Sequence, residues 1–155
     1  MDKFDEIQKL ISEAGDAVNF ADYGDGISKE WIIKAEERLG FRLPNSYKWW
    51  LKNYGGGEIY GEEIFSIYEG DFDTVGGGDI VYNYELNTKN NYYNKEKVVI
   101  CEVSDYVFYF DLSKRNDENE LPIYSLNDNK KYADDFIEFL KKRMNHYLII
   151  NKNYN

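Results

Sequence analysis

The chain has 155 residues, of which 43% are hydrophobic and 17% aromatic, enough for one folded domain with its own core. Its 29 Asp and Glu residues outnumber its 19 Lys and Arg residues, so the net charge is −10 near neutral pH. This charge argues against an ordinary nucleic-acid-binding protein, which needs clustered cations, and against binding to an anionic membrane.

Three helices are expected in the first third of the chain. The spacing of apolar residues predicts them over residues 2–14, 28–40 and 44–54. Asp2 and Ser28 are suitable N-caps for the first two helices, because their side-chain oxygens can accept from free backbone N–H groups. Pro44 suits the first turn of the third helix. That helix carries one apolar stripe, made of Tyr47, Trp50, Leu51 and Tyr54.

Beyond residue 57 the pattern changes to that of β-strands. Residues 64–68, 97–101 and 106–110 are predicted strands because they are rich in β-branched and aromatic residues, and 122–126 is a weaker one. Only four residues separate the second and third of these, which indicates an antiparallel hairpin. Residues 80–90 fit either a strand or a helix.

A last helix is expected near residues 133–144, followed by a loosely held tail at 147–155, so a single domain is assigned to residues 1–146. Helices, then a run of strands, then one more helix is typical of an α+β fold. We expect an antiparallel twisted sheet of about four to six strands with three to four helices packed against it.

Residue types that carry out chemistry are scarce. The single cysteine, Cys101, lies in an apolar run and is expected to be a buried, inert thiol, far along the chain from the single histidine, His146. The glycine-rich runs at 56–62 and 76–78 lack the lysine of a phosphate loop and the third glycine of a dinucleotide loop. The start of a calcium loop at 71–82 lacks the required acidic residues at its fifth and twelfth positions. We therefore expect no catalytic residues, no cofactor and no metal site.

The cellular compartment is inferred from what the sequence lacks. One cysteine excludes an intrachain disulfide. No stretch of about 18 apolar residues occurs, as a membrane-spanning helix would need. Residues 1–6 are acidic and have no signal-peptide character. A cytoplasmic protein is the expectation.

The remaining candidate is a protein-binding surface. Residues 58–79 contain seven carboxylates and no Lys or Arg, with aromatic residues between them, a composition suited to a basic partner. The alternative is an acidic loop whose aromatic side chains point into the core. Trp49 lies off the stripe of its helix, so it is either exposed or packed under the sheet. The candidate partner-binding residues are Glu58, Tyr60, Glu62, Glu63, Glu69, Asp71, Phe72, Asp73, Asp79 and Trp49.

The helix–loop–helix segment carries a recognisable motif. It consists of an acidic residue, a Leu-Gly pair, a Leu-Pro pair, a Tyr, an aromatic-Leu pair and a Gly-Gly pair. In this chain these are Glu36, Leu39-Gly40, Leu43-Pro44, Tyr47, Trp50-Leu51 and Gly55-Gly56. The motif resembles the signature of the SUKH superfamily, in its Smi/Knr-type branch. The resemblance continues through the hairpin and the last helix and covers residues 27–142.

The resemblance implies an α+β fold, a helix at 80–90, structural roles for the motif residues, and no enzymatic activity. Bacterial members resemble immunity proteins that bind and block the C-terminal toxic domain of a cognate secreted effector, often a nuclease. The nearest patterns are similar to antitoxins of toxins with an LXG-type secretion domain. The implied partner is thus a toxin domain, without nucleic acid or membrane, and the chain is expected to be a monomer or a weak homodimer. Eukaryotic members resemble regulators of cell-wall synthesis, so a regulatory scaffold is the alternative.

Overall fold

The computed structural model describes the backbone of residues 2–154 and the side chains of residues 2–146. Five α-helices are present in this part of the chain: α1 Lys3–Glu13, α2 Lys29–Leu39, α3 Asn45–Tyr54, α4 Ile80–Lys89 and α5 Phe136–Tyr154. Its strands are β1 Val18–Phe20, β2 Gly57–Ile59, β3 Glu62–Ile64, β4 Lys97–Val103, β5 Tyr106–Asp111, β6 Ile123–Ser125 and β7 Lys130–Ala133. The predicted α+β fold is confirmed.

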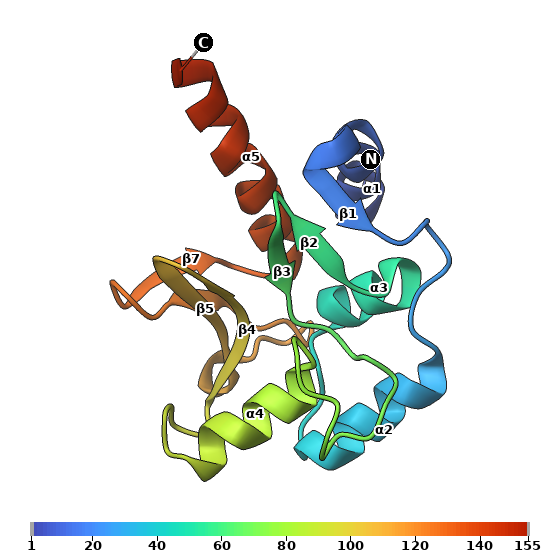
Figure 1. Ribbon diagram of the computed structural model, residues 1–155, viewed down its shortest axis with the longest axis vertical. Helices are drawn as coiled ribbons and strands as arrows, with labels where there is room; N and C mark the ends of the chain where they lie inside the picture. The colour runs from blue at the N-terminus through green and yellow to red at the C-terminus, as the bar shows by residue number, and fades with distance from the viewer. Residues whose placement is uncertain (1, 155) are drawn as a thin grey trace.

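The strands form two antiparallel sheets where the sequence predicts one. The first has the order β1-β2-β3 and the second the order β4-β5-β6-β7. They meet where the backbone N–H of Phe65, just after β3, donates to the carbonyl oxygen of Ile100 in β4 at 2.6 Å. In Figure 1 the sheets lie side by side, with α2 and α4 at one end of the molecule and α5 projecting from the other.

The helix signals in the sequence are confirmed in detail. The Asp2 side chain accepts from the backbone N–H of Asp5, and Ser28 caps α2 in the same way. Gly40 ends α2 in the left-handed region, with a φ of 84°. Residues 80–89 are helical, as the resemblance implies. Pro44 differs from the prediction: it is the N-cap of α3 and not part of the first turn.

Several strands differ from the prediction. In place of the strand expected at 64–68, the structure has β3 at Glu62–Ile64, which pairs with β2 in a short hairpin. Within 65–68, Ser66 forms an isolated β-bridge with Asp79. The three-residue strands β1 and β2 and the four-residue strand β7 were not predicted. Ala133 ends β7, so the last helix begins at Phe136 and not near residue 133.

The end of the chain bears on the predicted domain boundary. The backbone of α5 continues to Tyr154 and so runs through most of the segment predicted as a tail, 147–155. Side chains beyond residue 146 lie outside the described part of the structure. The boundary at residue 146 therefore stays a prediction.

An aromatic core joins α3 to both sheets. Tyr47 and Trp50 of α3 and Phe136 of α5 are fully buried, and the Phe136 ring centroid lies 5.1 Å from that of Tyr47 and 5.2 Å from that of Trp50. The Tyr47 ring also meets Phe110 of β5, edge to face, at 5.4 Å. Its hydroxyl donates to the carbonyl oxygen of Phe65 at 2.6 Å. The apolar stripe of α3 thus packs where the two sheets meet.

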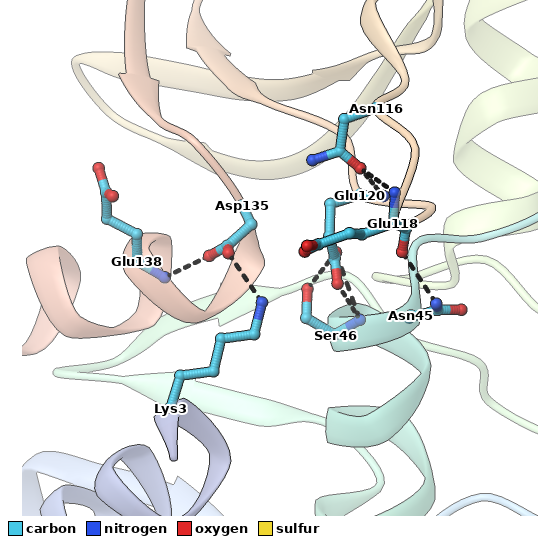
Figure 2. A network of polar contacts seen from close by, with 8 residues as sticks. All are labelled: Lys3, Asn45, Ser46, Asn116, Glu118, Glu120, Asp135 and Glu138. Atoms are coloured by element: carbon cyan, nitrogen blue, oxygen red, sulfur yellow. Dashed lines mark hydrogen bonds and ion pairs between the residues drawn. The ribbon is translucent and has the colours of Figure 1, made fainter. Parts of the chain in front are cut away.

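A distant carboxylate caps α3, because Pro44 offers no side-chain acceptor. Glu120, in the loop before β6, accepts from the backbone N–H of Ser46 at 3.0 Å and from its hydroxyl at 2.6 Å (Figure 2). In the same loop, the carbonyl oxygen of Glu118 accepts from the side-chain amide of Asn45 at 3.0 Å. These bonds fix the start of α3, and with it the orientation of the motif helix.

Stability is expected to depend on pH through Glu120. Its burial raises the pKa of the carboxyl above its usual range, and the two hydrogen bonds from Ser46 offset only part of that rise. The folded state therefore holds the proton more tightly than the unfolded state, so Glu120 contributes stability as the pH falls through the raised pKa and loses it as the pH rises. We expect Glu120→Gln to flatten this dependence above about pH 4.3, the ordinary pKa of glutamate.

The measurement is urea unfolding at a series of pH values. Glu120→Ala serves as the comparison: it removes the same titrating group, so its pH dependence should also be flattened, and it removes both acceptors, which is expected to cost about a further 1–3 kcal/mol. A Glu120→Gln variant with the same pH dependence as the natural chain would show that another group is responsible.

Candidate functional site

The seven carboxylates of residues 58–79 occupy three different environments. Two are half-buried in the β2–β3 hairpin, one is buried at the start of α4, and four are exposed. In that order they are Glu58 and Glu62; Asp79; and Glu63, Glu69, Asp71 and Asp73. The segment is therefore only in part a surface that a partner could reach.

Glu62 faces the interior of the molecule. Its carboxylate forms an ion pair with Arg143 of α5 at 2.6 Å, and the two side chains are 20% and 6% exposed, respectively. The guanidinium of Arg143 lies over the ring of Phe108, with its central carbon 5.1 Å from the centroid. Glu62 thus holds the first sheet to α5, and its role is structural.

Asp79 has no surface to offer a partner. The residue is fully buried, and its two carboxylate oxygens accept from the backbone N–H groups of Tyr82 at 2.8 Å and Tyr68 at 3.0 Å. It caps α4 and fixes the preceding segment against it.

Tyr60 also has a structural role. It is half-buried, and with Gly61 it forms the hairpin turn between β2 and β3, where both residues have the positive φ that a type I′ turn requires.

The loop between Tyr68 and Asp79, called here the acidic loop, lies across α2 (Figure 1). The ring of Phe72 meets Trp31 of α2 edge to face, with centroids 5.8 Å apart. The carboxylate of Asp73 binds the guanidinium of Arg38, which also donates to Glu85 of α4 at 2.9 Å. Arg38 therefore ties the acidic loop to two helices and holds two carboxylates side by side.

Both ends of the acidic loop are fixed as well. Near its start, a carboxylate oxygen of Glu69 accepts from the backbone N–H of Ser28 at 3.2 Å. The Tyr68 hydroxyl donates to Glu63 at 2.6 Å and accepts from the backbone N–H of Gly78 at 2.8 Å. The exposed carboxylates are thus presented by an ordered loop, which lowers the entropy lost on binding.

A hollow of about 300 Å³ separates the acidic loop from α4. Leu86, at its wall, is 39% exposed. The hollow is lined by Phe72, Asp73, Tyr82, Glu85, Leu86 and Lys89. We call this hollow together with the exposed carboxylates Glu63, Glu69 and Asp71 the acidic patch.

Four members of the acidic patch, all from α4, were not among the predicted residues: Tyr82, Glu85, Leu86 and Lys89. A signal for them exists in the sequence, since Tyr82, Glu85, Leu86 and Lys89 fall at i, i+3, i+4 and i+7. The signal applies if residues 80–90 form a helix, as the resemblance implies and the structure shows.

Trp49 is not part of the acidic patch. Its half-buried ring packs against Phe4 of α1 at 5.0 Å and against Tyr54 at 5.8 Å, measured between centroids. It lines a different hollow, between α2 and α3. Trp49 therefore packs beneath α1, whereas the sequence left it either exposed or under the sheet.

Cys101 is buried in β4, as predicted. Burial raises the pKa of its thiol to about 12, and the nearby Arg143 lowers it only in part. At pH 8 the reactive thiolate would then be about one molecule in ten thousand, against about one in four for an ordinary cysteine with a pKa near 8.5.

We expect the native protein not to react with a thiol reagent such as dithionitrobenzoate at pH 8, and to react once when unfolded in urea. Rapid reaction of the folded protein would contradict the buried placement.

Within the described residues, no three His, Cys, Asp or Glu side chains lie close enough together to hold a metal ion.

The motif residues of the helix–loop–helix segment have structural roles. The Glu36 carboxylate accepts from the backbone N–H of Leu43 at 2.8 Å and so closes the loop between α2 and α3. Gly56 has a φ of 125°, and a Cβ there would lie 2.6 Å from the hydroxyl oxygen of Ser66. A side chain at Gly56 would therefore force the two segments apart.

This arrangement matches a known family over most of the chain. The SUKH_6 family model, described as SMI1-KNR4 cell-wall, matches residues 29–140. The chain belongs to the SMI1-KNR4 (SUKH) family. Among solved structures, a crystal structure of a protein from Pseudomonas syringae pv. tomato is similar to this SUKH protein, with a TM-score of 0.61 and 12% identity, over 88% of this chain and 95% of that one. That likeness shows a shared fold. None of the described helices combines the length and hydropathy that crossing a membrane requires.

Proposed function

We propose that this SUKH protein is an immunity protein that binds the toxic domain of a cognate secreted effector, a nuclease, in the cytoplasm. The observation that carries the proposal is the acidic patch, where the exposed carboxylates of the segment accompany a hollow lined in part by Phe72 and Leu86, on a chain of net charge −10. A nuclease presents a basic cleft because it binds phosphates. The acidic patch would occlude that cleft, without cofactor or catalysis.

The composition of the acidic patch suits this role. Phe72 and Leu86, in the lining of its hollow, offer apolar contacts of the kind that carry much of an interface's energy. The exposed carboxylates of the acidic patch, such as Asp71, speed the encounter with a basic partner by electrostatic steering. Because Arg38 already orders Asp73 and Glu85, little rearrangement is needed on binding.

The test is co-expression with the C-terminal domain of the toxin encoded beside this gene, an LXG-type toxin by the resemblance. A stable one-to-one complex, together with restored growth of cells that express the toxin domain, is the expected result. No complex and no restored growth would reject the immunity role.

The family description favours one alternative, a regulatory scaffold of cell-wall synthesis. A scaffold would bind several unrelated proteins, and no toxin domain among them. Affinity purification from the native cell distinguishes the two, since an immunity protein is expected to retain one partner in equal amount.

A further inference from the structure

A second surface lies on the opposite side of α2 from the acidic loop. The helical repeat places Trp31, Lys34 and Arg38 toward the loop, so residues half a turn away face α3. There the two helices border a groove of about 410 Å³. Each contributes residues at i, i+3, i+4 and i+7: Lys29, Ile32, Ile33 and Glu36 from α2, and Asn45, Lys48, Trp49 and Lys52 from α3.

The floor of this groove is apolar. Of the two isoleucines that line it, Ile33 is 43% exposed and Ile32 is buried. The half-buried ring of Trp49 forms the other wall and is held in place by Phe4 and Tyr54. Exposed isoleucine beside tryptophan gives a partner an apolar contact that is already ordered.

The rim of the groove is basic. Lys29 and Lys52 are exposed and form no ion pair with any residue whose side chain is described. Lys48 pairs with Glu36 at 3.3 Å, and Glu36 also accepts from the backbone N–H of Leu43. The lining of the groove thus contains three lysines and one engaged glutamate, so the lining carries a positive charge on a chain of net charge −10.

We propose that this lysine groove docks an acidic amphipathic helix of a partner protein. A helix can lie in the groove with an apolar stripe on Ile33 and Trp49. Carboxylates flanking that stripe would reach Lys29 and Lys52 on the two sides. The charge of the groove is opposite to that of the acidic patch, so the two surfaces select different partners.

The probe is a synthetic 18-residue helical peptide with leucines at i, i+3, i+4 and i+7 and glutamates on both flanks. Its control has the same leucines with lysines on the flanks. We expect calorimetry with the full chain to show binding of the acidic peptide only, weakened by salt. Equal binding of both peptides, or binding of neither, would overturn the proposal.

Matched variants locate the binding site. Lys29→Glu/Lys52→Glu is expected to weaken binding at least tenfold, and Ile33→Asn to weaken it as much by removing the apolar contact. Lys9→Glu/Lys95→Glu carries the same change in charge at exposed positions elsewhere and should bind as the natural chain does. An equal loss in this control would overturn the assignment to the groove.

An anionic surface other than protein would give a different result. Binding to phosphatidylserine vesicles that the same lysine changes abolish, with no binding of the peptide, would assign the groove to lipid and overturn the proposal. The proposal is independent of the immunity role: failure to bind the toxin domain leaves peptide binding unaffected, and the reverse also holds.

Discussion

Replacing Glu62 by Ala is expected to lower the free energy of unfolding by about 3 kcal/mol, because it leaves the buried guanidinium of Arg143 without its counter-ion. Arg143 is 6% exposed, so it is poorly solvated once the carboxylate is lost. The estimate lies at the low end of the range for broken buried pairs, since Glu62 itself is 20% exposed. Urea unfolding followed by tryptophan fluorescence measures the change.

The neighbouring Glu63 provides a matched control. It belongs to the same strand, but its carboxylate is exposed and contacts Tyr68. Glu63→Ala is therefore expected to cost less than about 1 kcal/mol. The double variant Glu62→Ala/Arg143→Met should recover much of the loss, because an apolar side chain tolerates the site better than a buried guanidinium that has lost its carboxylate. Equal losses in Glu62→Ala and Glu63→Ala would show that the ion pair contributes little.

Glu62 and Glu63 are neighbours in the sequence but lie in different environments, which the sequence alone did not predict. Successive side chains of a strand point to opposite faces, so two adjacent glutamates in a strand cannot both face a partner. The rule could not be applied because β3, three residues long, was not recognised at 62–64. Composition alone made both residues look like parts of one acidic surface.

Local signals account for what could be predicted. The helix starts at Asp2 and Ser28 depend on hydrogen bonds between residues three positions apart, and such caps can be recognised in the sequence. The short strand β1 is defined instead by pairing across the chain, Val18 with Ile59, which no local pattern records. The cap of α3 by Glu120 is likewise non-local, because Ser46 and Glu120 meet only in the folded molecule.

In the candidate site, too, local features could be predicted from the sequence and contacts between distant segments could not. The acidic segment 58–79 was predicted from its composition, and four of its seven carboxylates are exposed, three of them in the acidic loop. Its contact with α4, through Asp73, Arg38 and Glu85, depends on tertiary packing. The helix α2 carries the acidic loop on one side and the lysine groove on the other, so one short element organises both surfaces.

Reversing charge in the acidic loop is expected to abolish protection against the toxin. Asp71→Lys/Asp73→Lys places two cations where a basic cleft would dock, while Glu69 is left in place because it binds the backbone of Ser28. Because Asp73 also binds Arg38, Asp73→Ala is measured beside it, since this variant breaks that ion pair without adding a cation. Steering lost in the double variant should slow association with the toxin domain by about 100-fold at low ionic strength. Added salt should reduce the difference in association rate between the variant and the natural chain, because it screens exposed charges.

The matched control is Asp105→Lys/Asp117→Lys, which makes the same change in net charge at two exposed positions outside the acidic loop. Association rates of the purified toxin domain, measured by stopped flow, should separate the two variants, and restored growth should follow the same order. If both variants slowed association equally, net charge and not the acidic patch would drive the encounter. If the loop variant protected cells as well as the natural chain does, the toxin would bind at another face of the molecule, since a docking site at the acidic patch cannot accept two added cations beside a basic cleft.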